Sequence, residues 1–189
     1  LDALMMGGSP ELLQKQRPPR PPEGFSPFEP GPKAAVRPTG LYENILRRVA
    51  PYGVRGVIWY QGEDDDARGW HAFYDESMKA LIQSWRRLWK RELPFLQVEL
   101  APLHEGLGKA LNYAVIREKQ RDVMDALPGV HNVCILDAGD ARNIHVRKKR
   151  PVGERLALLA RKYVYGEMEL LADSPRLCSA GRADSTVSL

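Results

Sequence analysis

The stretch Val54-Arg-Gly-Val-Ile-Trp-Tyr60, followed at once by Gln61-Gly62, decides the fold. β-Branched and aromatic residues dominate it, which is typical of a buried strand, and the glycine behind it marks a loop. Two more runs of strand length follow, at residues 94–100 and 132–136. The sequence therefore predicts three strands, each ending in a loop.

Helical patterns alternate with these strands. The clearest is an apolar stripe at residues 70–89, and weaker ones cover 41–49, 110–127 and 152–165, the last ending before Gly166. Helices of this length between strands form crossover connections, which predict βαβ units and a parallel sheet. We expect an α/β fold of three layers, α/β/α, with helices on both faces of the sheet.

The chain divides into three regions by composition. Residues 1–36 are crowded with proline and glycine and predict a connector, with room for one short helix at 10–16. Residues 37–168 carry the strand and helix patterns and predict the folded domain. Residues 169–189 are rich in Ser, Ala and Asp, which favours a flexible tail.

Composition excludes several classes of partner. The 189 residues hold 28 basic and 24 acidic side chains, a mixed excess of +4 that does not favour nucleic acid. No apolar run reaches the roughly 20 residues that cross a bilayer, so we expect no membrane partner. Cys134 and Cys178 stand far apart and predict neither a disulfide framework nor a zinc site. The sequence leaves localisation open.

The loop after the first predicted strand is a candidate for chemistry, because ligands of parallel sheets bind beyond the carboxyl ends of the strands. Gln61 can donate an amide N–H to a developing oxyanion, and Gly62 permits close approach of a substrate to the backbone. The alternative is a plain polar turn.

The loop after the third predicted strand is a second candidate. It holds His145, a possible general base, together with Asp137 and Asp140, either of which can fix the tautomer of a histidine. In the alternative interpretation His145 is a surface residue and the aspartates only end the strand and cap the turn. Sequence spacing alone does not decide between the two.

Two charged runs carry less weight. The acidic residues 63–66 offer oxygen ligands for a hard cation but lack the spacing of a calcium loop, so a solvated loop is favoured. The basic residues 147–150 have no aromatic platform beside them, so a solvated surface is again favoured. We predict no metal site.

An ordered set of short motifs resembles the sialate O-acetylesterases, within the broader SGNH serine hydrolases. The most specific is Gly56-Val-Ile-Trp-Tyr-Gln-Gly-Glu63. The others, in chain order, are Pro38-Thr-Gly-Leu-Tyr42, Trp85-Arg86, Pro94-Phe-Leu96, Asp137-Ala-Gly-Asp140, Ile144-His145 and Val152-Gly-Glu-Arg-Leu156. The resemblance covers residues 36–165.

This resemblance implies an esterase that removes acetyl groups from hydroxyls of sialic acid or related sugars, by a Ser-His-Asp mechanism and without a cofactor. It implies that His145 is the catalytic histidine and that Gln61 and Gly62 serve the oxyanion or substrate side. Glu63 would support their loop. Of the two candidate acids we place Asp140 before Asp137, because it lies closer to His145 in sequence.

The nucleophile is the main departure from the family pattern. The family places its serine in a Gly-Gln-Ser-Asn-like segment after the first strand of the sheet, and this sequence has none. Ser9 precedes a proline and follows no apolar strand, so we interpret it as structural. Asp64 and Val146 also replace the serine and the proline that are usual at their positions.

We therefore expect the C-terminal part of such an esterase domain, without its N-terminal strands. The missing N-terminal segment of the same domain would then be a partner that supplies the serine. The alternative is a non-catalytic truncated remnant or a carbohydrate-binding piece.

Overall fold

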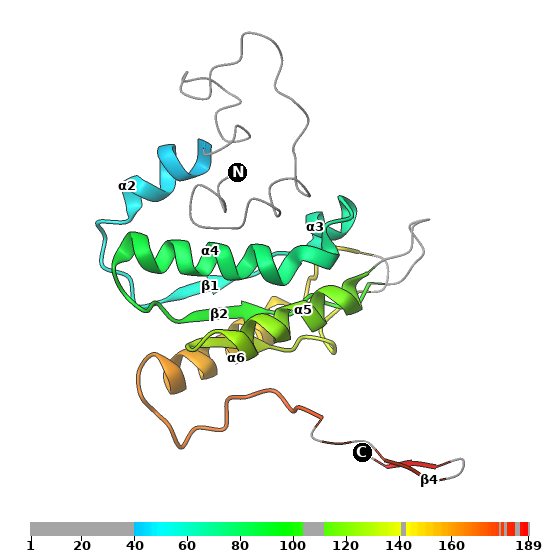
Figure 1. Ribbon diagram of the computed structural model, residues 1–189. Helices are drawn as coiled ribbons and strands as arrows, with labels where there is room; N and C mark the ends of the chain where they lie inside the picture. The colour runs from blue at the N-terminus through cyan, green and yellow to red at the C-terminus, as the bar shows by residue number, and fades with distance from the viewer. Residues whose placement is uncertain are drawn as a thin grey trace, which may run out of the picture.

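A parallel sheet of three strands forms the centre of the protein (Figure 1). The computed structural model describes residues 40–103, 112–140, 143–177, 179, 181–183 and 186–188. The strands are β1 (Val57–Trp59), β2 (Phe95–Val98) and β3 (Val130–Val133), and they lie side by side in that order. Their register pairs Ile58 with Leu96, and Leu96 with His131.

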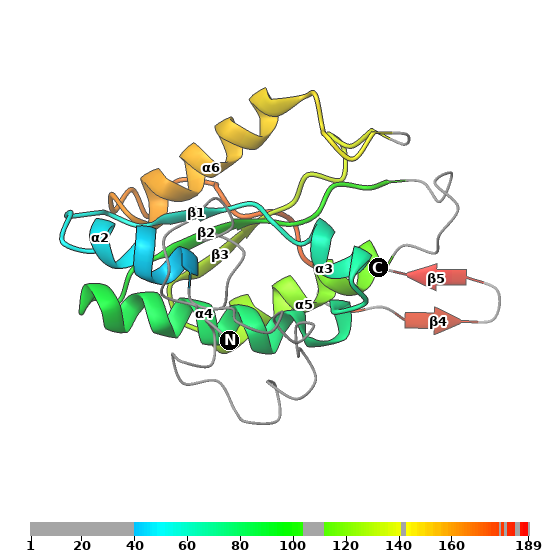
Figure 2. The same ribbon diagram turned by 90° about the horizontal axis from the view of Figure 1, so that it is seen from above.

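Helices cover both faces of this sheet. Viewed from above, α4 (Tyr74–Trp89) and α5 (Tyr113–Ala126) lie on one face, and α6 (Lys149–Tyr163) lies on the other (Figure 2). Each helix follows a strand along the chain, and the strands run parallel. The predicted three-layer α/β/α architecture is confirmed.

The layers enclose two apolar cores, one on each face of the sheet. Phe95 belongs to the cluster under α4 and α5, whereas its neighbour Leu96 belongs to the cluster under α6. This alternation follows from the pleat, which points successive side chains to opposite faces. Both faces of β2 are therefore buried, and all four of its residues are shielded from solvent.

The acidic run at residues 63–66 differs from the predicted solvated loop. It forms the short helix α3 (Glu63–Ala67), and Asp66 is buried within it. Asp66 accepts hydrogen bonds from the backbone N–H and the side-chain amide of Asn112, both at 3.0 Å. Those bonds make burial of the carboxylate tolerable. The predicted helix at 70–89 starts later, as the single turn η3 (His71–Phe73) followed by α4.

The edge of the sheet at β1 is open. Among the described residues β1 pairs only with β2, and Ile58 at its centre is 65% exposed. On the α4 side of β1, the π-helical turn η2 (Tyr42–Leu46) and the turn α2 (Arg47–Val49) carry the exposed apolar side chains Ile45 and Val49, and the exposed Leu41 precedes them.

The segment after α6 is tied to the body of the protein near residue 174. The Ser174 hydroxyl oxygen accepts the backbone N–H of Cys134 at 3.1 Å, and Arg176 binds both carboxylate oxygens of Asp125. Further on, β4 (Gly181–Ala183) and β5 (Thr186–Ser188) form an antiparallel hairpin. The flexible tail expected at residues 169–189 and the three domain boundaries stay a prediction.

The connector predicted for residues 1–36, with its short helix at 10–16 and Ser9, lies outside the described residues, as does Cys178. In the part of the chain that the structure describes, no helix is long and apolar enough to cross a membrane.

Candidate active site

The loops that follow β1 and β3 each contact the loop that follows β2, at the carboxyl edge of the sheet. The first contact joins Gly62, after β1, to Leu100, after β2: a Cβ on Gly62 would lie 3.2 Å from Leu100 Cδ1. The second joins Gly139, after β3, to Pro102, where a Cβ would lie 2.5 Å from the ring. Two glycines thus let the predicted oxyanion loop and the predicted histidine loop meet on the β2 loop.

Gln61 is held at both its backbone and its side chain. The Tyr74 hydroxyl donates to the Gln61 carbonyl oxygen at 3.0 Å, and the Gln61 Nε2 donates to the Asp65 carboxylate. Gly62 follows with a φ of +151°, and a Cβ there would also lie 3.1 Å from Ile116. The loop is therefore fixed by specific contacts rather than left as a free polar turn.

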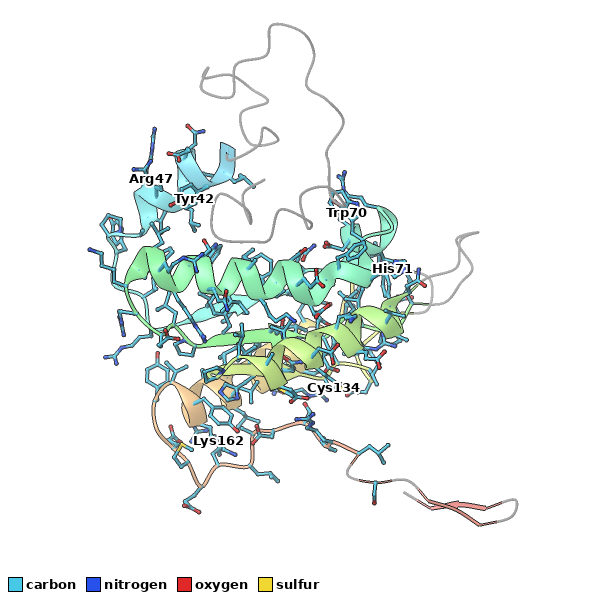
Figure 3. The ribbon with its side chains drawn as sticks, viewed as in Figure 1. Tyr42, Arg47, Trp70, His71, Cys134 and Lys162 are labelled. Atoms are coloured by element: carbon cyan, nitrogen blue, oxygen red, sulfur yellow. The ribbon has the colours of Figure 1, made fainter. Side chains whose placement is uncertain are left out.

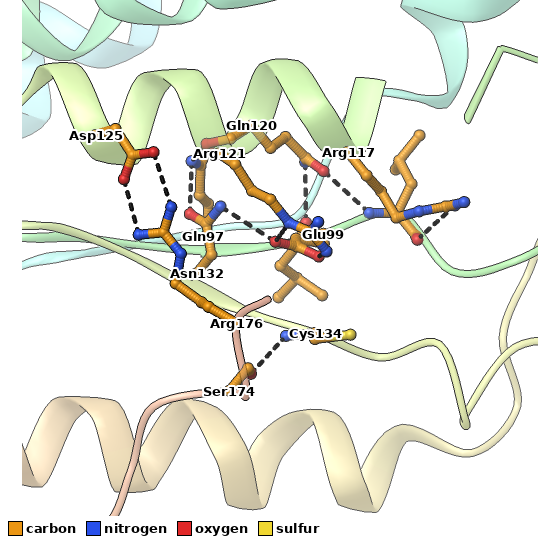
Figure 4. Close-up of polar contacts among 12 residues, drawn as sticks. Gln97, Glu99, Arg117, Gln120, Arg121, Asp125, Asn132, Cys134, Ser174 and Arg176 are labelled. Atoms are coloured by element: carbon orange, nitrogen blue, oxygen red, sulfur yellow. Dashed lines mark hydrogen bonds and ion pairs between the residues drawn. The ribbon is translucent and has the colours of Figure 1, made fainter. Parts of the chain in front are cut away.

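A buried hydrogen-bond network supports this loop from behind. Gln120 is fully buried on α5, and its Nε2 donates to the Val98 carbonyl at 3.0 Å and to the Tyr74 hydroxyl at 3.5 Å. Its Oε1 accepts the Leu100 N–H at 3.1 Å (Figure 4). Burial raises the pKa of Tyr74 to about 12, so the hydroxyl keeps its proton and can donate to Gln61.

Glu63 stands among tyrosines at the start of α3. Burial, followed by the negative charges of Glu63 and Asp66, raises the pKa of Tyr113 to about 12. Burial and Glu63 raise the pKa of Tyr60 as well. The charge of Glu63 thus acts on two tyrosines, and its place at the start of α3 fits the predicted role in supporting the loop.

Asp137 is committed to an ion pair. Arg155 on α6 donates to both of its carboxylate oxygens, at 2.6 and 2.7 Å, and also to the Cys134 carbonyl at 2.8 Å. The bond from Arg155 lowers the pKa of Asp137 to about 2. Asp137 thus links the end of β3 to α6.

His145 is exposed at the same edge of the sheet. Its backbone N–H donates to the Asn143 side-chain oxygen at 2.8 Å, and the next residue, Val146, is buried in the core under α6. Lys149, at the start of α6, lies over the ring of Tyr60 at 4.9 Å. These contacts anchor the histidine loop beside the end of β1, with the imidazole turned to solvent. Asp140 is partly buried in this loop, and residues 141–142 lie outside the described part.

A cavity of 590 Å³ opens next to Gln61. The cavity runs along α4 from Tyr42 to Trp70. Figure 3 labels these two residues near opposite ends of the helix. Its walls are mainly apolar, from η2, β1 and α4, and Asp64 and Asp65 line it beside Gln61.

Sequence reasoning missed four residues that shape this site. Asp65 follows Gln61 by four residues but stands in an acidic run that gives no sign of its role. Tyr74 and Arg155 stand in helical patterns that predict only core or surface positions. Gln120 left a readable signal. It is a polar residue on the buried face of a helix that otherwise presents Tyr113, Ile116 and Val123.

Comparison with known proteins identifies the family. Residues 28–162 match the family described as carbohydrate esterase, sialic acid-specific acetylesterase. That match covers most of the chain. The chain belongs to this family. The predicted resemblance to sialate O-acetylesterases and the SGNH-like fold are thereby confirmed.

A solved structure resembles this acetylesterase-family chain in sequence and in fold. It is a carbohydrate acetylesterase from Xanthomonas citri, 38% identical, with a TM-score of 0.68. The similarity covers 75% of this chain but 33% of the other, so the match spans about a third of that relative's length. A search of curated proteins found no match.

Proposed function

We propose that this site removes acetyl groups from the hydroxyls of an O-acetylated sugar, sialic acid or a related one, by a Ser-His-Asp mechanism. The observation that carries the proposal is the meeting of the Gln61 loop and the His145 loop on the β2 loop, through Gly62–Leu100 and Gly139–Pro102. Family membership and the carbohydrate acetylesterase among the solved structures support the substrate class.

His145 acts as the general base in this proposal. Its exposed imidazole can take the proton of an attacking hydroxyl and return it to the leaving sugar oxygen. Asp140 is the preferred partner because both carboxylate oxygens of Asp137 already accept N–H groups from Arg155. Asp137 then fixes the loop to α6, while Asp140 orients the imidazole.

Gln61 and Gly62 stabilise the oxyanion that forms when the acetyl carbonyl is attacked. One hydrogen of the Gln61 Nε2 is used by Asp65, which leaves the second for the substrate. Gly62 has no Cβ, which lets its backbone pack against Ile116 and Leu100 and so holds the backbone beside Gln61 in place. Donors of this kind are worth about 10²–10³ in kcat when they are preorganised.

In this proposal the serine nucleophile comes from the segment that carries the family's Gly-Gln-Ser-Asn-like motif, which this sequence does not contain. Two features favour a protein segment at the edge of β1: the exposed Ile58 and, on the α4 side of the strand, the apolar cavity lined by Trp59. A strand added there in parallel would end next to Gln61. It would also bury apolar surface that water now contacts.

Acetate release from O-acetylated sialic acid and from acetylated neutral sugars tests the proposal. The purified chain, mixed with the serine-bearing remainder of a related acetylesterase, is compared with its His145→Ala, Asp140→Asn and Asp137→Asn variants in the same mixture. Each variant is checked for folding by circular dichroism, and the unmixed chain is measured beside them. We expect activity to fall by at least about 10³ in His145→Ala, to fall strongly in Asp140→Asn, and to fall less in Asp137→Asn.

Three results would decide between parts of this scheme. A larger loss in Asp137→Asn than in Asp140→Asn would reverse the assignment of the acid. No release by the chain alone, with release restored when the remainder of a related acetylesterase is added, would support the external serine. Absence of activity in both settings would favour a non-catalytic remnant.

A further inference from the structure

We propose that Asp65 is a positioning residue that sets the orientation of the Gln61 side-chain amide for the reaction. The inference rests on the proposed function, because it assigns Asp65 a role through the oxyanion donor of that site. The two residues lie four positions apart, where the start of α3 carries the Asp65 carboxylate back to the end of β1.

A carboxylate can fix an amide because it has no hydrogen to donate once it is ionised. The two ends of a glutamine amide have nearly the same shape, so a neutral neighbour would allow either the oxygen or the nitrogen to face it. Asp65 accepts only, and the Gln61 Nε2 therefore faces it. The direction of the second N–H is fixed by the same contact.

Tyr74 makes this orientation effective by holding the other end of Gln61. Its hydroxyl binds the Gln61 carbonyl oxygen, while Gly62 is packed between Ile116 and Leu100. The backbone cannot move to compensate for a rotation of the amide. With both ends held, the donor is preorganised and loses little entropy when an oxyanion forms.

Asp64, the neighbour of Asp65, also lies at the start of α3, so it serves as a comparison. Its carboxylate is exposed and pairs with Arg68 on the next turn of the chain. Asp65 is more buried and points to Gln61 instead. If Asp65 only stabilised the start of the helix by its charge, the two residues would be equivalent.

The hydrogen bond between Gln61 and Asp65 depends on pH, and the direction of the change follows from the pKa of Asp65. Burial raises the pKa of Asp65, and the negative charge of Asp64 raises it further, while the hydrogen bond from Gln61 and the charge of Arg68 lower it. The Tyr74 hydroxyl, the nearest titratable group from α4, stays neutral in the same range. Because the pKa of Asp65 is raised on balance, protonation of Asp65 releases the amide at a higher pH than for an unperturbed aspartate.

The test follows the Gln61 side-chain amide by ¹⁵N–¹H NMR in the full chain, and does not depend on hydrolysis. The signal pair is assigned as the one that disappears in Gln61→Ala. We expect two well-separated proton shifts in the wild type, and expect Asp65→Asn to bring them close to the values of a free glutamine. Asp64→Asn, the matched control, leaves them unchanged, and an acid titration of the wild type moves them with the transition of Asp65.

Outcomes separate this inference from the proposed function. A Gln61 signal that ignores both Asp65→Asn and the acid titration overturns the positioning role, even if the protein releases acetate. Where acetate release is measurable, Asp65→Asn should lower kcat about 10-fold or more and change KM little. An equal loss in Asp64→Asn, or a change confined to KM, would also refute it.

Discussion

Gly139 lies directly against Pro102: a Cβ built on this glycine would sit 2.5 Å from both Cγ and Cδ of the proline and 2.7 Å from its carbonyl oxygen. Real Cβ atoms do not approach other atoms so closely. The contact joins the loops after β2 and β3, and Asp140 is the next residue along the chain. The position of Asp140, the proposed catalytic acid, thus depends on residue 139 being a glycine, which has no side chain to collide with Pro102.

Gly139→Ala should therefore destabilise the protein and displace Asp140. Backbone atoms and a rigid proline ring cannot move aside cheaply, so we expect a loss of about 1–3 kcal/mol in the free energy of unfolding, measured by urea denaturation. Gly153→Ala is the control, because it lies within α6 with nothing near its Cβ. It should raise stability by about 0.5–1 kcal/mol. Equal stability of Gly139→Ala and the wild type would contradict the contact.

The Asp137–Arg155 pair predicts a pH effect with a clear sign. The arginine lowers the pKa of Asp137 to about 2 from an ordinary value of 3.8. The folded state therefore holds the ionised form more strongly than the unfolded state does. Its stabilising contribution is complete above about pH 4 and is lost as pH falls towards 2. Both groups are exposed, so the effect on overall stability is small.

Carboxyl ¹³C NMR titration measures this directly. In Arg155→Ala the midpoint of Asp137 should rise towards 3.8, whereas Arg161→Ala, which breaks the separate pair with Glu167, should leave it in place. An unshifted midpoint in Arg155→Ala would mean that the ion pair does not control Asp137. The preference for Asp140 as the catalytic acid would then lose its structural support.

The elements of the fold could be predicted because their signals are local. The run Val57–Trp59 is rich in strand-forming residues, and the stripe that includes Met78, Ile82 and Trp85 repeats at helical spacing. Element ends were less predictable. The strand expected at 132–136 spans Val130–Val133, because pairing with β2 rather than apolar content sets where it lies.

Only the residues of the site that stand in family motifs could be predicted from the sequence. Gln61 and His145 stand in stretches that resemble the acetylesterases, whereas the contacts that hold them join distant parts of the chain. Gln120 reaches Tyr74 across 46 positions, and no local pattern encodes that pairing. Burial of Asp66 could not be read either, since its partner Asn112 also lies 46 positions away.

Gln120 should stabilise the loops at the carboxyl edge of the sheet. Gln120→Ala removes an acceptor from the Leu100 N–H and donors from the Val98 carbonyl and the Tyr74 hydroxyl, and it leaves a cavity in a fully buried place. We expect the free energy of unfolding to fall by about 2–4 kcal/mol in urea denaturation. Glu118→Ala, exposed on the same helix, should change it by less than about 0.5 kcal/mol. A small effect of Gln120→Ala would mean that water replaces the amide.

The open edge of β1 predicts self-association of the purified chain. Ile58 is 65% exposed at the centre of an edge strand, where unpaired backbone groups can bind another strand. On the α4 side of β1, Leu41 and Ile45 are 49% and 54% exposed and add further apolar surface. In sedimentation velocity we expect the average mass to rise with protein concentration.

Ile58→Lys should shift that equilibrium towards the monomer, because a charged lysine on an edge strand opposes pairing. Leu171→Lys is the control: its side chain is 89% exposed, but it lies after α6 and away from the sheet edge. If both variants reduced association equally, general apolar exposure would be the cause. A wild-type chain that stays monomeric at all concentrations would instead show that the β1 edge is already covered, and a serine-bearing strand could not then dock there from another molecule.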